Sequence, residues 1–155
     1  HPAGEQEKFS KGTQTKSEEN AIISALREGD FDAVVLMGYM KKIGPDMVNE
    51  FGWRREYTIP YQANMLNTHP GLLPQTKGSY GLQAQQLTLV KHMPYGGQTL
   101  HIVAEDYDDG PVIAEHKVPI SPNDNAESLF AKVQEIEKQT LPTDVDEFIK
   151  NRQNY

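Results

Sequence analysis

One stretch of this sequence bears most directly on the fold: Ala33-Val34-Val35-Leu36-Met37-Gly38. Its apolar residues are continuous rather than alternating, which is typical of a strand in a parallel sheet that is covered on both faces. Helical patterns lie on either side of it, from Ser17 to Gly29 and from Pro45 to Phe51. A buried strand between two helices predicts an α/β fold.

Strand and helix patterns alternate along the rest of the chain. Strand patterns cover 98–104 and 112–118, and helical patterns cover 83–91, 128–138 and the residues from Pro142 onward. We therefore expect an open, mostly parallel α/β sheet flanked by helices. These elements form one domain over 17–155, whereas residues 1–16 are polar, show no apolar periodicity and are expected to be mobile.

The composition narrows the classes of partner and chemistry. The 155 residues include 15 basic and 22 acidic ones, for a net charge of −7, which disfavours a nucleic-acid or anionic membrane surface. Cysteine is absent, so disulfides, thiolate nucleophiles and cysteine-ligated zinc are excluded. The apolar runs are too short to cross a bilayer, and the sequence predicts a cytoplasmic protein with small-molecule partners.

The candidate site begins with Asn67-Thr68-His69-Pro70-Gly71-Leu72-Leu73-Pro74, which follows the apolar pair Met65-Leu66. Asn67 and His69 are two residues apart, so their side chains point the same way if the segment is extended, and Pro70 favours that conformation. In open α/β sheets, ligands bind beyond the carboxyl ends of the strands. The loop can therefore present an amide and an imidazole to a ligand, or the two side chains can simply satisfy nearby backbone groups.

A second polar cluster, Asp106, Asp108 and Asp109, lies in the turn between the two later strands and ends in Gly110-Pro111. Turns favour aspartate for local reasons, so each carboxylate alone has an ordinary structural explanation. The spacing along the chain does not show whether one of them meets His69.

Both stretches resemble segments of a known family, the folate-dependent formyltransferases, which includes glycinamide ribonucleotide transformylase. Asn67–Pro74 is similar to the family's active-site loop, Asn-x-His-x-Ser-x-Leu-Pro, and Leu100–Ile113 resembles the strand–turn–strand that supplies the catalytic aspartate. The resemblance extends from Ser17 to Phe148. The catalytic residues that it implies are Asn67, His69 and Asp108.

The resemblance also implies the reaction, which moves a formyl group from 10-formyltetrahydrofolate to the amine of glycinamide ribonucleotide in purine biosynthesis. Attack of the amine builds negative charge on the formyl oxygen, to which Asn67 and a protonated His69 can donate hydrogen bonds. Asp108 can keep His69 charged and assist removal of the amine proton. No metal is needed, and the folate is expected as a co-substrate.

Further site residues are implied by the resemblance rather than by local pattern. The positions that match the family's pterin pocket are Tyr39, Met40, Lys41, Lys42, Ile43, Val48, Val103 and Ala104. Gln134 and Glu137 match positions that contact the amine substrate. Taken alone, the first set is equally typical of core and loop residues, and the other two are typical of a solvated helix face.

Three features depart from the family pattern. Gly71 stands where the family has Ser, which removes a hydroxyl, and residues 52–64 form a longer excursion than is usual before the Asn-x-His loop. The family also begins with a strand and a Gly-Ser-rich loop that binds the substrate phosphate at a helix N-terminus, and residues 1–16 contain neither. We therefore expect the sheet to lack the family's first strand and phosphate loop, and the exposed edge favours a homo-oligomer.

Other functions are compatible with the same residues. With water as the acceptor, the site gives a formyltetrahydrofolate hydrolase. Relatives that formylate sugar nucleotides or methionyl-tRNA share the site, although a net charge of −7 disfavours tRNA. The chain can also be a non-catalytic folate-binding fragment or one piece of a split enzyme.

Overall fold

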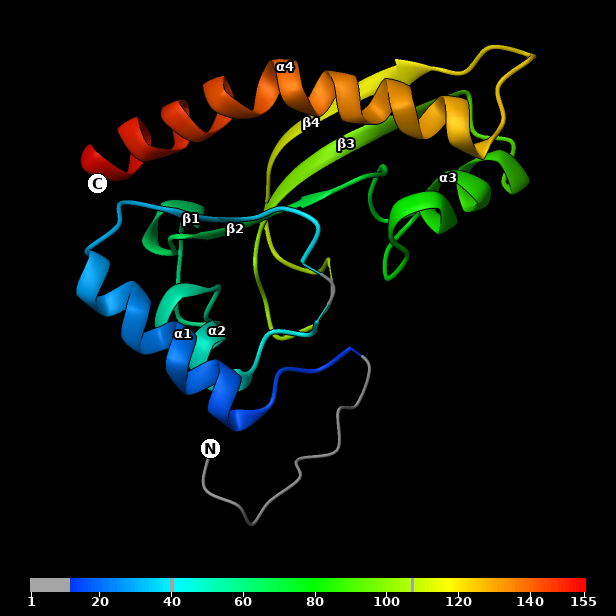
Figure 1. The fold of residues 1–155 in the computed structure, drawn as a ribbon. Coiled ribbons are helices and arrows are strands. Elements are labelled where there is room, and N and C mark those ends of the chain that lie inside the picture. The colour runs from blue at the N-terminus through cyan, green and yellow to red at the C-terminus, as the bar shows by residue number, and fades with distance from the viewer. Residues whose placement is uncertain (1–11, 40, 107) are drawn as a thin grey trace.

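The computed structural model describes residues 12–39, 41–106 and 108–155. In this part of the chain the strands form an open sheet in the order β1-β2-β3-β4, shown in Figure 1. The strands are β1 (Val34–Leu36), β2 (Met65–His69), β3 (Tyr95–Ile102) and β4 (Val112–Pro119). β1 and β2 are parallel, whereas the β2–β3 and β3–β4 pairs are antiparallel.

The α/β class with an open sheet is therefore confirmed, with one correction: the sheet is mixed rather than mostly parallel. The connections explain the difference. The crossover between β1 and β2, which contains α2 (Pro45–Phe51) and the 3-10 turn η1 (Pro60–Gln62), is long enough to join parallel strands. β3 and β4 are joined by a short turn, which only antiparallel neighbours permit.

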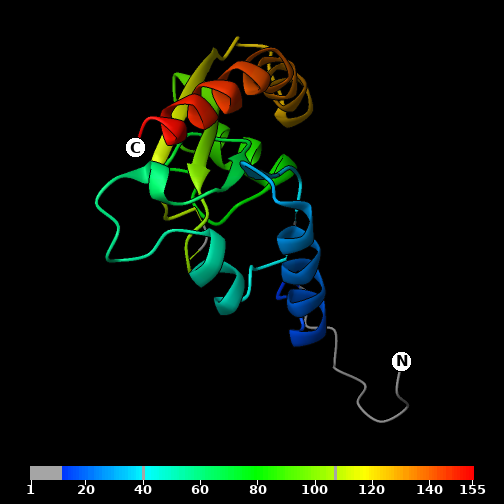
Figure 2. The ribbon, with the colours of Figure 1, turned by 90° about the vertical axis from the view of Figure 1, so that its left-hand side faces the viewer.

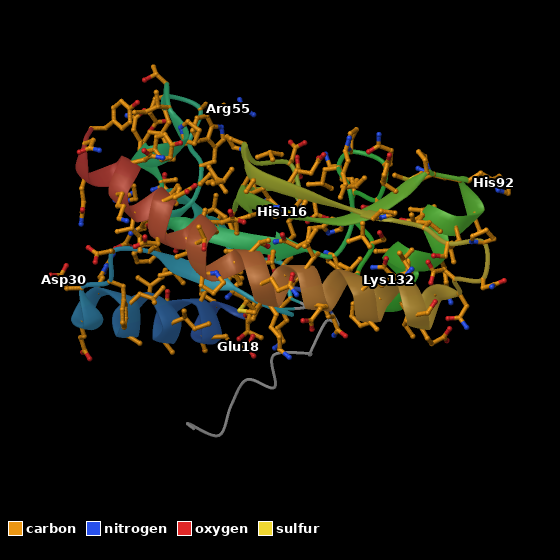
Figure 3. The ribbon with its side chains drawn as sticks, turned by 90° about the horizontal axis from the view of Figure 1, so that it is seen from above. Glu18, Asp30, Arg55, His92, His116 and Lys132 are labelled. Atoms are coloured by element: carbon orange, nitrogen blue, oxygen red, sulfur yellow. The ribbon has the colours of Figure 1, made fainter. Side chains whose placement is uncertain are left out.

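Helices cover both faces of this sheet. The longest described helix, α4 (Ala126–Gln153), runs along one face, and α3 (Gly81–Val90) packs against it (Figure 1). α1 (Lys16–Gly29) and α2 lie on the opposite side, beside β1 (Figures 1 and 2). Seen from above in Figure 3, α4 passes beside His116 of β4, whose Nε2 lies 2.7 Å from Oδ2 of Asp144 on the helix.

α1 begins at Lys16, close to the predicted start, because Thr15 caps it. The Thr15 hydroxyl accepts from the Glu18 N–H at 3.2 Å, and the Glu18 carboxylate accepts from the Thr15 N–H at 2.9 Å. This reciprocal capping box satisfies two N–H groups at the start of the helix. The helix ends at Gly29 as predicted, and Asp30 follows in the left-handed conformation.

The two C-terminal helical patterns form one helix rather than the two that were predicted. α4 passes through Pro142, although proline has no N–H to bond with the carbonyl four residues before it. Burial around the proline outweighs this loss. Leu141 and Phe148 are 8% and 1% exposed, and they pack in one cluster with Leu66 and Leu100 of the sheet.

The core lies on both faces of β2 because its side chains alternate. Leu66 packs against α4, whereas Met65 packs with apolar residues of α1 and α2. Residues two apart on a strand share a face, so Asn67 and His69 lie on the side of Met65. The strand therefore directs both predicted catalytic side chains away from α4.

The end of the predicted mobile segment is packed against the rest of the protein. The chain on either side of Thr13 pairs with Lys42, and Gln14, 8% exposed, accepts from the Gly44 N–H at 2.8 Å. Residues 1–11 of that segment lie outside the described part of the chain. Among the described helices, none is long and apolar enough to cross a membrane.

Candidate active site

Asn67 and His69 lie at the end of β2 rather than on a loop after it. The register places Asn67 beside His101 of β3, and Asn67 Nδ2 is 3.1 Å from His101 Nε2. His69 Nδ1 and His101 Nε2 lie 3.4 and 3.3 Å from the same carboxylate oxygen, Oδ1 of Asp108. The structure therefore brings the three predicted catalytic residues into one cluster, together with His101.

Asp108 reaches the histidines because the connection between β3 and β4 folds over the end of β2. Its backbone is in the left-handed region, with φ of 52°, which aspartate adopts more readily than most residues. The Gly78 N–H donates to its second oxygen, Oδ2, at 2.9 Å. The neighbouring Asp109 is exposed and pairs with Lys77 at 2.6 Å. The turn thus sends these two carboxylates in different directions, with Asp108 toward the cluster.

Burial controls the charges of this cluster. The side chains of His69 and Asp108 are 3% and 8% exposed. Burial lowers the pKa of His69 below its usual value, although the negative charge of Asp108 opposes this. Burial tends to raise the pKa of Asp108, but the hydrogen bond from His101 and the charge of His69 hold that pKa below its usual value. The arrangement favours an ionised carboxylate beside a neutral His69 at neutral pH, rather than the charged imidazole that the resemblance implied.

A pocket opens beside this cluster. It is lined by Leu36, Tyr39, Lys41, Lys42, Ile43, Asn67, His101, Val103, Ala104, Glu105, Asp106 and Asp108. Of the positions predicted to bind folate, those in this lining are Tyr39, Lys41, Lys42, Ile43, Val103 and Ala104. Val48 is instead 5% exposed in the core beside α1, and Met40 lies outside the described residues. His69 is held behind the pocket wall, between Asp108 and Thr76.

The two residues predicted to contact the amine substrate lie elsewhere. Gln134 and Glu137 are on α4, and neither is in the lining of this pocket. Gln134 is exposed, whereas burial raises the pKa of the half-buried Glu137 and a hydrogen bond from Thr68 partly offsets the rise. Thr68 is on the face of β2 opposite to Asn67 and His69. The structure therefore does not bring these two residues to the pocket.

Two members of the cluster were not predicted as site residues. His101 bridges Asn67 and Asp108, and Thr76 places its hydroxyl 2.8 Å from His69 Nε2. The sequence did offer one signal for His101, a polar residue within the apolar strand pattern 98–104. Its position beside Asn67, however, depends on the register of β2 with β3, which the sequence pattern does not show. Thr76 gave no local signal. Among the described residues, no group of three or more His, Asp or Glu is arranged to hold a metal ion.

The chain is similar in sequence to proteins of a known family. The family model described as formyl transferase matches residues 3–145. The phosphoribosylglycinamide formyltransferase of Haemophilus influenzae is 32% identical over 134 residues, which are 86% of this chain and 57% of that protein. The chloroplastic phosphoribosylglycinamide formyltransferase of Vigna unguiculata is 32% identical over 133 residues, which are 84% of this chain and 39% of that protein.

Solved structures show the same likeness. The crystal structure of phosphoribosylglycinamide formyltransferase from Bacillus halodurans superposes with a TM-score of 0.72 at 31% identity, covering 87% of this chain and 63% of that one. The chain thus spans less than two thirds of the length of each of these relatives. The family model, however, matches well over half of its 155 residues. The chain therefore belongs to the formyl transferase family.

Proposed function

We propose that this chain transfers a formyl group from 10-formyltetrahydrofolate to the amine of glycinamide ribonucleotide, a reaction of purine biosynthesis. The observation that carries the proposal is the placement of Asn67, His101 and Asp108 together in the wall of one pocket. The names of the relatives in Haemophilus influenzae and Vigna unguiculata, both phosphoribosylglycinamide formyltransferases, support the choice of acceptor.

The reaction forms a bond between the amine nitrogen and the formyl carbon, and it breaks the bond between that carbon and N10 of the folate. Negative charge develops on the formyl oxygen during attack, and Asn67 is the amide donor that faces the pocket. The amine loses a proton, and N10 gains one as it leaves. Asp108, ionised and in the same pocket wall, accepts the amine proton directly or through water.

The two histidines have different positions in this proposal. His101 is in the pocket wall, and it can donate to the formyl oxygen only if its Nε2 leaves Asp108, because its Nδ1 faces the Ile102 carbonyl oxygen at 3.0 Å. His69 lies behind the wall, with Nδ1 facing Asp108 and Nε2 facing Thr76. His69 orients the carboxylate, because its Nδ1 faces Oδ1 of Asp108. Direct donation from His69 to the formyl oxygen, as the resemblance implied, requires its ring to leave one of these two partners.

The substrates are proposed to meet at the end of β2. The folate ring occupies the pocket against Tyr39, Ile43 and Val103, whose side chains give it an apolar wall. Lys42 adds positive charge for the carboxylates of the folate, whereas the ammonium of Lys41, which also lines the pocket, pairs with Glu18. Gln134 and Glu137 are proposed to contact the ribonucleotide, which must then extend past the end of β2 toward α4.

We further propose that the partners are these small molecules rather than a nucleic acid, and that the protein works in the cytoplasm. A net charge of −7 supports the proposed absence of a nucleic-acid partner. Among the described strands, β1 forms an edge of the sheet and pairs with β2 on one side. Self-association through this edge is the proposed route to a homo-oligomer, and sedimentation as a strict monomer would contradict it.

The function is tested by the rate at which 10-formyltetrahydrofolate loses its formyl group, followed by absorbance with and without glycinamide ribonucleotide. Asn67→Ala is compared with Asn49→Ala, a matched control that is exposed on α2 and outside the pocket. We expect loss that requires the ribonucleotide and is slower by about 10²–10³ in Asn67→Ala but unchanged in Asn49→Ala.

Each other outcome points to another function. Loss of the formyl group without the ribonucleotide identifies a hydrolase that uses water. No loss under either condition rules out catalysis by this chain alone and favours a folate-binding fragment or one piece of a split enzyme.

A further inference from the structure

Thr76 is a buried hydroxyl beside His69 that the mechanism above does not use. Its side chain is 0% exposed, and Oγ1 lies 2.8 Å from His69 Nε2 and 2.8 Å from the carbonyl oxygen of Leu72. The same carbonyl also accepts from the Thr76 N–H at 3.1 Å. The Leu72 carbonyl therefore keeps a donor whichever way the hydroxyl proton points.

The Thr76 hydroxyl has one proton and two lone pairs, so its hydrogen bonds can follow the charge of His69. When His69 is neutral and carries its proton on Nδ1, facing Asp108, the bare Nε2 accepts from the hydroxyl. When His69 is protonated, Nε2–H donates to Oγ1, and the hydroxyl proton turns to the Leu72 carbonyl. Nε2 is satisfied in both states, and no side chain has to move.

We propose that Thr76 is a positioning residue that lets His69 gain and lose a proton without leaving a buried ring nitrogen unpaired. An unpaired nitrogen in this place is costly because water does not reach it. The proposal rests on the proposed function, in which His69 orients the Asp108 carboxylate that takes the proton from the amine. Thr76 acts through His69 and does not line the pocket.

The titratable groups near His69 do not provide a partner for its Nε2, which faces Thr76. Among the described residues, the titratable groups that act on His69 are Asp108, in the turn between β3 and β4, and His101 on β3. Both lie toward the pocket, where Nδ1 points. Lys77, next to Thr76 in the chain, pairs with Asp109 at 2.6 Å with both side chains exposed, so its charge is directed to solvent.

Gly71 makes the space that the Thr76 hydroxyl occupies. A Cβ on residue 71 would overlap Thr76 Oγ1, and it would lie 2.9 Å from Thr76 Cβ and 3.1 Å from His69 Nε2. The Ser of the family pattern therefore does not fit at residue 71 while Thr76 is in its observed place. Gly71 and Thr76 form a coupled pair, in which the hydroxyl near His69 comes from residue 76 rather than residue 71.

The direct test is a nuclear magnetic resonance titration of the His69 ring, assigned with His69→Gln, in the wild type, T76V and T76S. T76V keeps the shape of threonine but removes the hydroxyl. We expect it to shift the His69 titration to lower pH, because the charged ring loses its acceptor at Nε2, whereas T76S leaves the titration in place. The fall of kcat/KM for formyl transfer at low pH should likewise move to lower pH in T76V and stay in place in T76S.

The kinetic expectation separates positioning from loss of structure. T76V should lower kcat/KM about tenfold, the effect of one buried hydrogen bond, through kcat rather than the KM for folate. T76S should restore it to within about twofold. An unchanged His69 titration in T76V overturns the proposal.

Gly71→Ala gives a second measurement that leaves the threonine in place, and it serves if T76V does not fold. The added methyl group displaces the hydroxyl, so the same shift to lower pH is expected. In a T76A background the methyl should have a smaller effect, because the overlapping oxygen is gone. Equal effects in both backgrounds contradict the coupling. The titration needs no substrate, so a wild type without formyl transfer refutes the proposed function separately.

Discussion

Asp108→Asn removes the carboxylate that joins the two histidines and replaces it with an amide of the same size. Oδ1 lies 3.4 Å from His69 and 3.3 Å from His101, and Oδ2 accepts from the Gly78 N–H at 2.9 Å. The amide oxygen can keep the Gly78 bond and hold the turn, but an amide does not accept the amine proton. Loss of a general base should lower kcat/KM by about 10²–10⁴, which corresponds to roughly 3–5 kcal/mol of transition-state stabilisation.

Asp109→Asn is the matched control for this change. It makes the same chemical replacement one residue along, at a side chain that is 54% exposed and pairs with Lys77. Exposed ion pairs contribute little, so kcat/KM should stay within about twofold of the wild type. Both variants are assayed for formyl transfer that depends on glycinamide ribonucleotide, and thermal unfolding checks that each is folded. The reasoning is refuted if Asp108→Asn keeps activity within about threefold of the wild type, or if the two variants lose activity equally.

Three further predictions concern stability. Because burial lowers the pKa of His69, the unfolded chain binds a proton near the ordinary value of 6.5 and the folded chain only at lower pH. The free energy of unfolding should therefore fall as pH drops below about 6.5, and it should fall less in His69→Gln. If urea unfolding gives the same pH dependence of this free energy in both proteins, the prediction is contradicted. Phe148→Ala, at a side chain 1% exposed, should cost about 3–5 kcal/mol, whereas Phe31→Ala, at 55% exposed, should cost under about 0.5 kcal/mol by denaturant unfolding. Thr15→Ala removes the cap of α1 and should cost about 1 kcal/mol in the same assay; no measurable loss would show that the cap is not needed.

Much of the fold could be predicted because its signals are local. The continuous run around Val34–Leu36 indicated β1, and Pro45 marked the start of α2. Pro142 misled because the local rule, that proline ends a helix, competes with burial of Leu141 and Phe148 in the core. The mixed sheet was missed because the direction of a strand depends on its connections and partners, which the apolar pattern does not record.

The candidate site was predicted in part for the same reason. The spacing of Asn67 and His69 placed both on one face of a strand, and the resemblance selected Asp108, which the structure places beside them. His101 meets Asn67 only through the register of β2 with β3. The position of Thr76 beside His69 depends on the turn after Pro74, and the lowered pKa of His69 depends on how tightly these segments enclose it.

The most direct test of the central claim follows the carbon atom that is transferred. With 10-formyltetrahydrofolate labelled on the formyl carbon, mass spectrometry identifies the product made by the wild type and by Asn67→Ala in the presence of glycinamide ribonucleotide. We predict that the label appears on the amine of the ribonucleotide, and that Asn67→Ala forms this product about 10²–10³ times more slowly. Label found in free formate, or formylated ribonucleotide made equally fast by Asn67→Ala, would contradict the account.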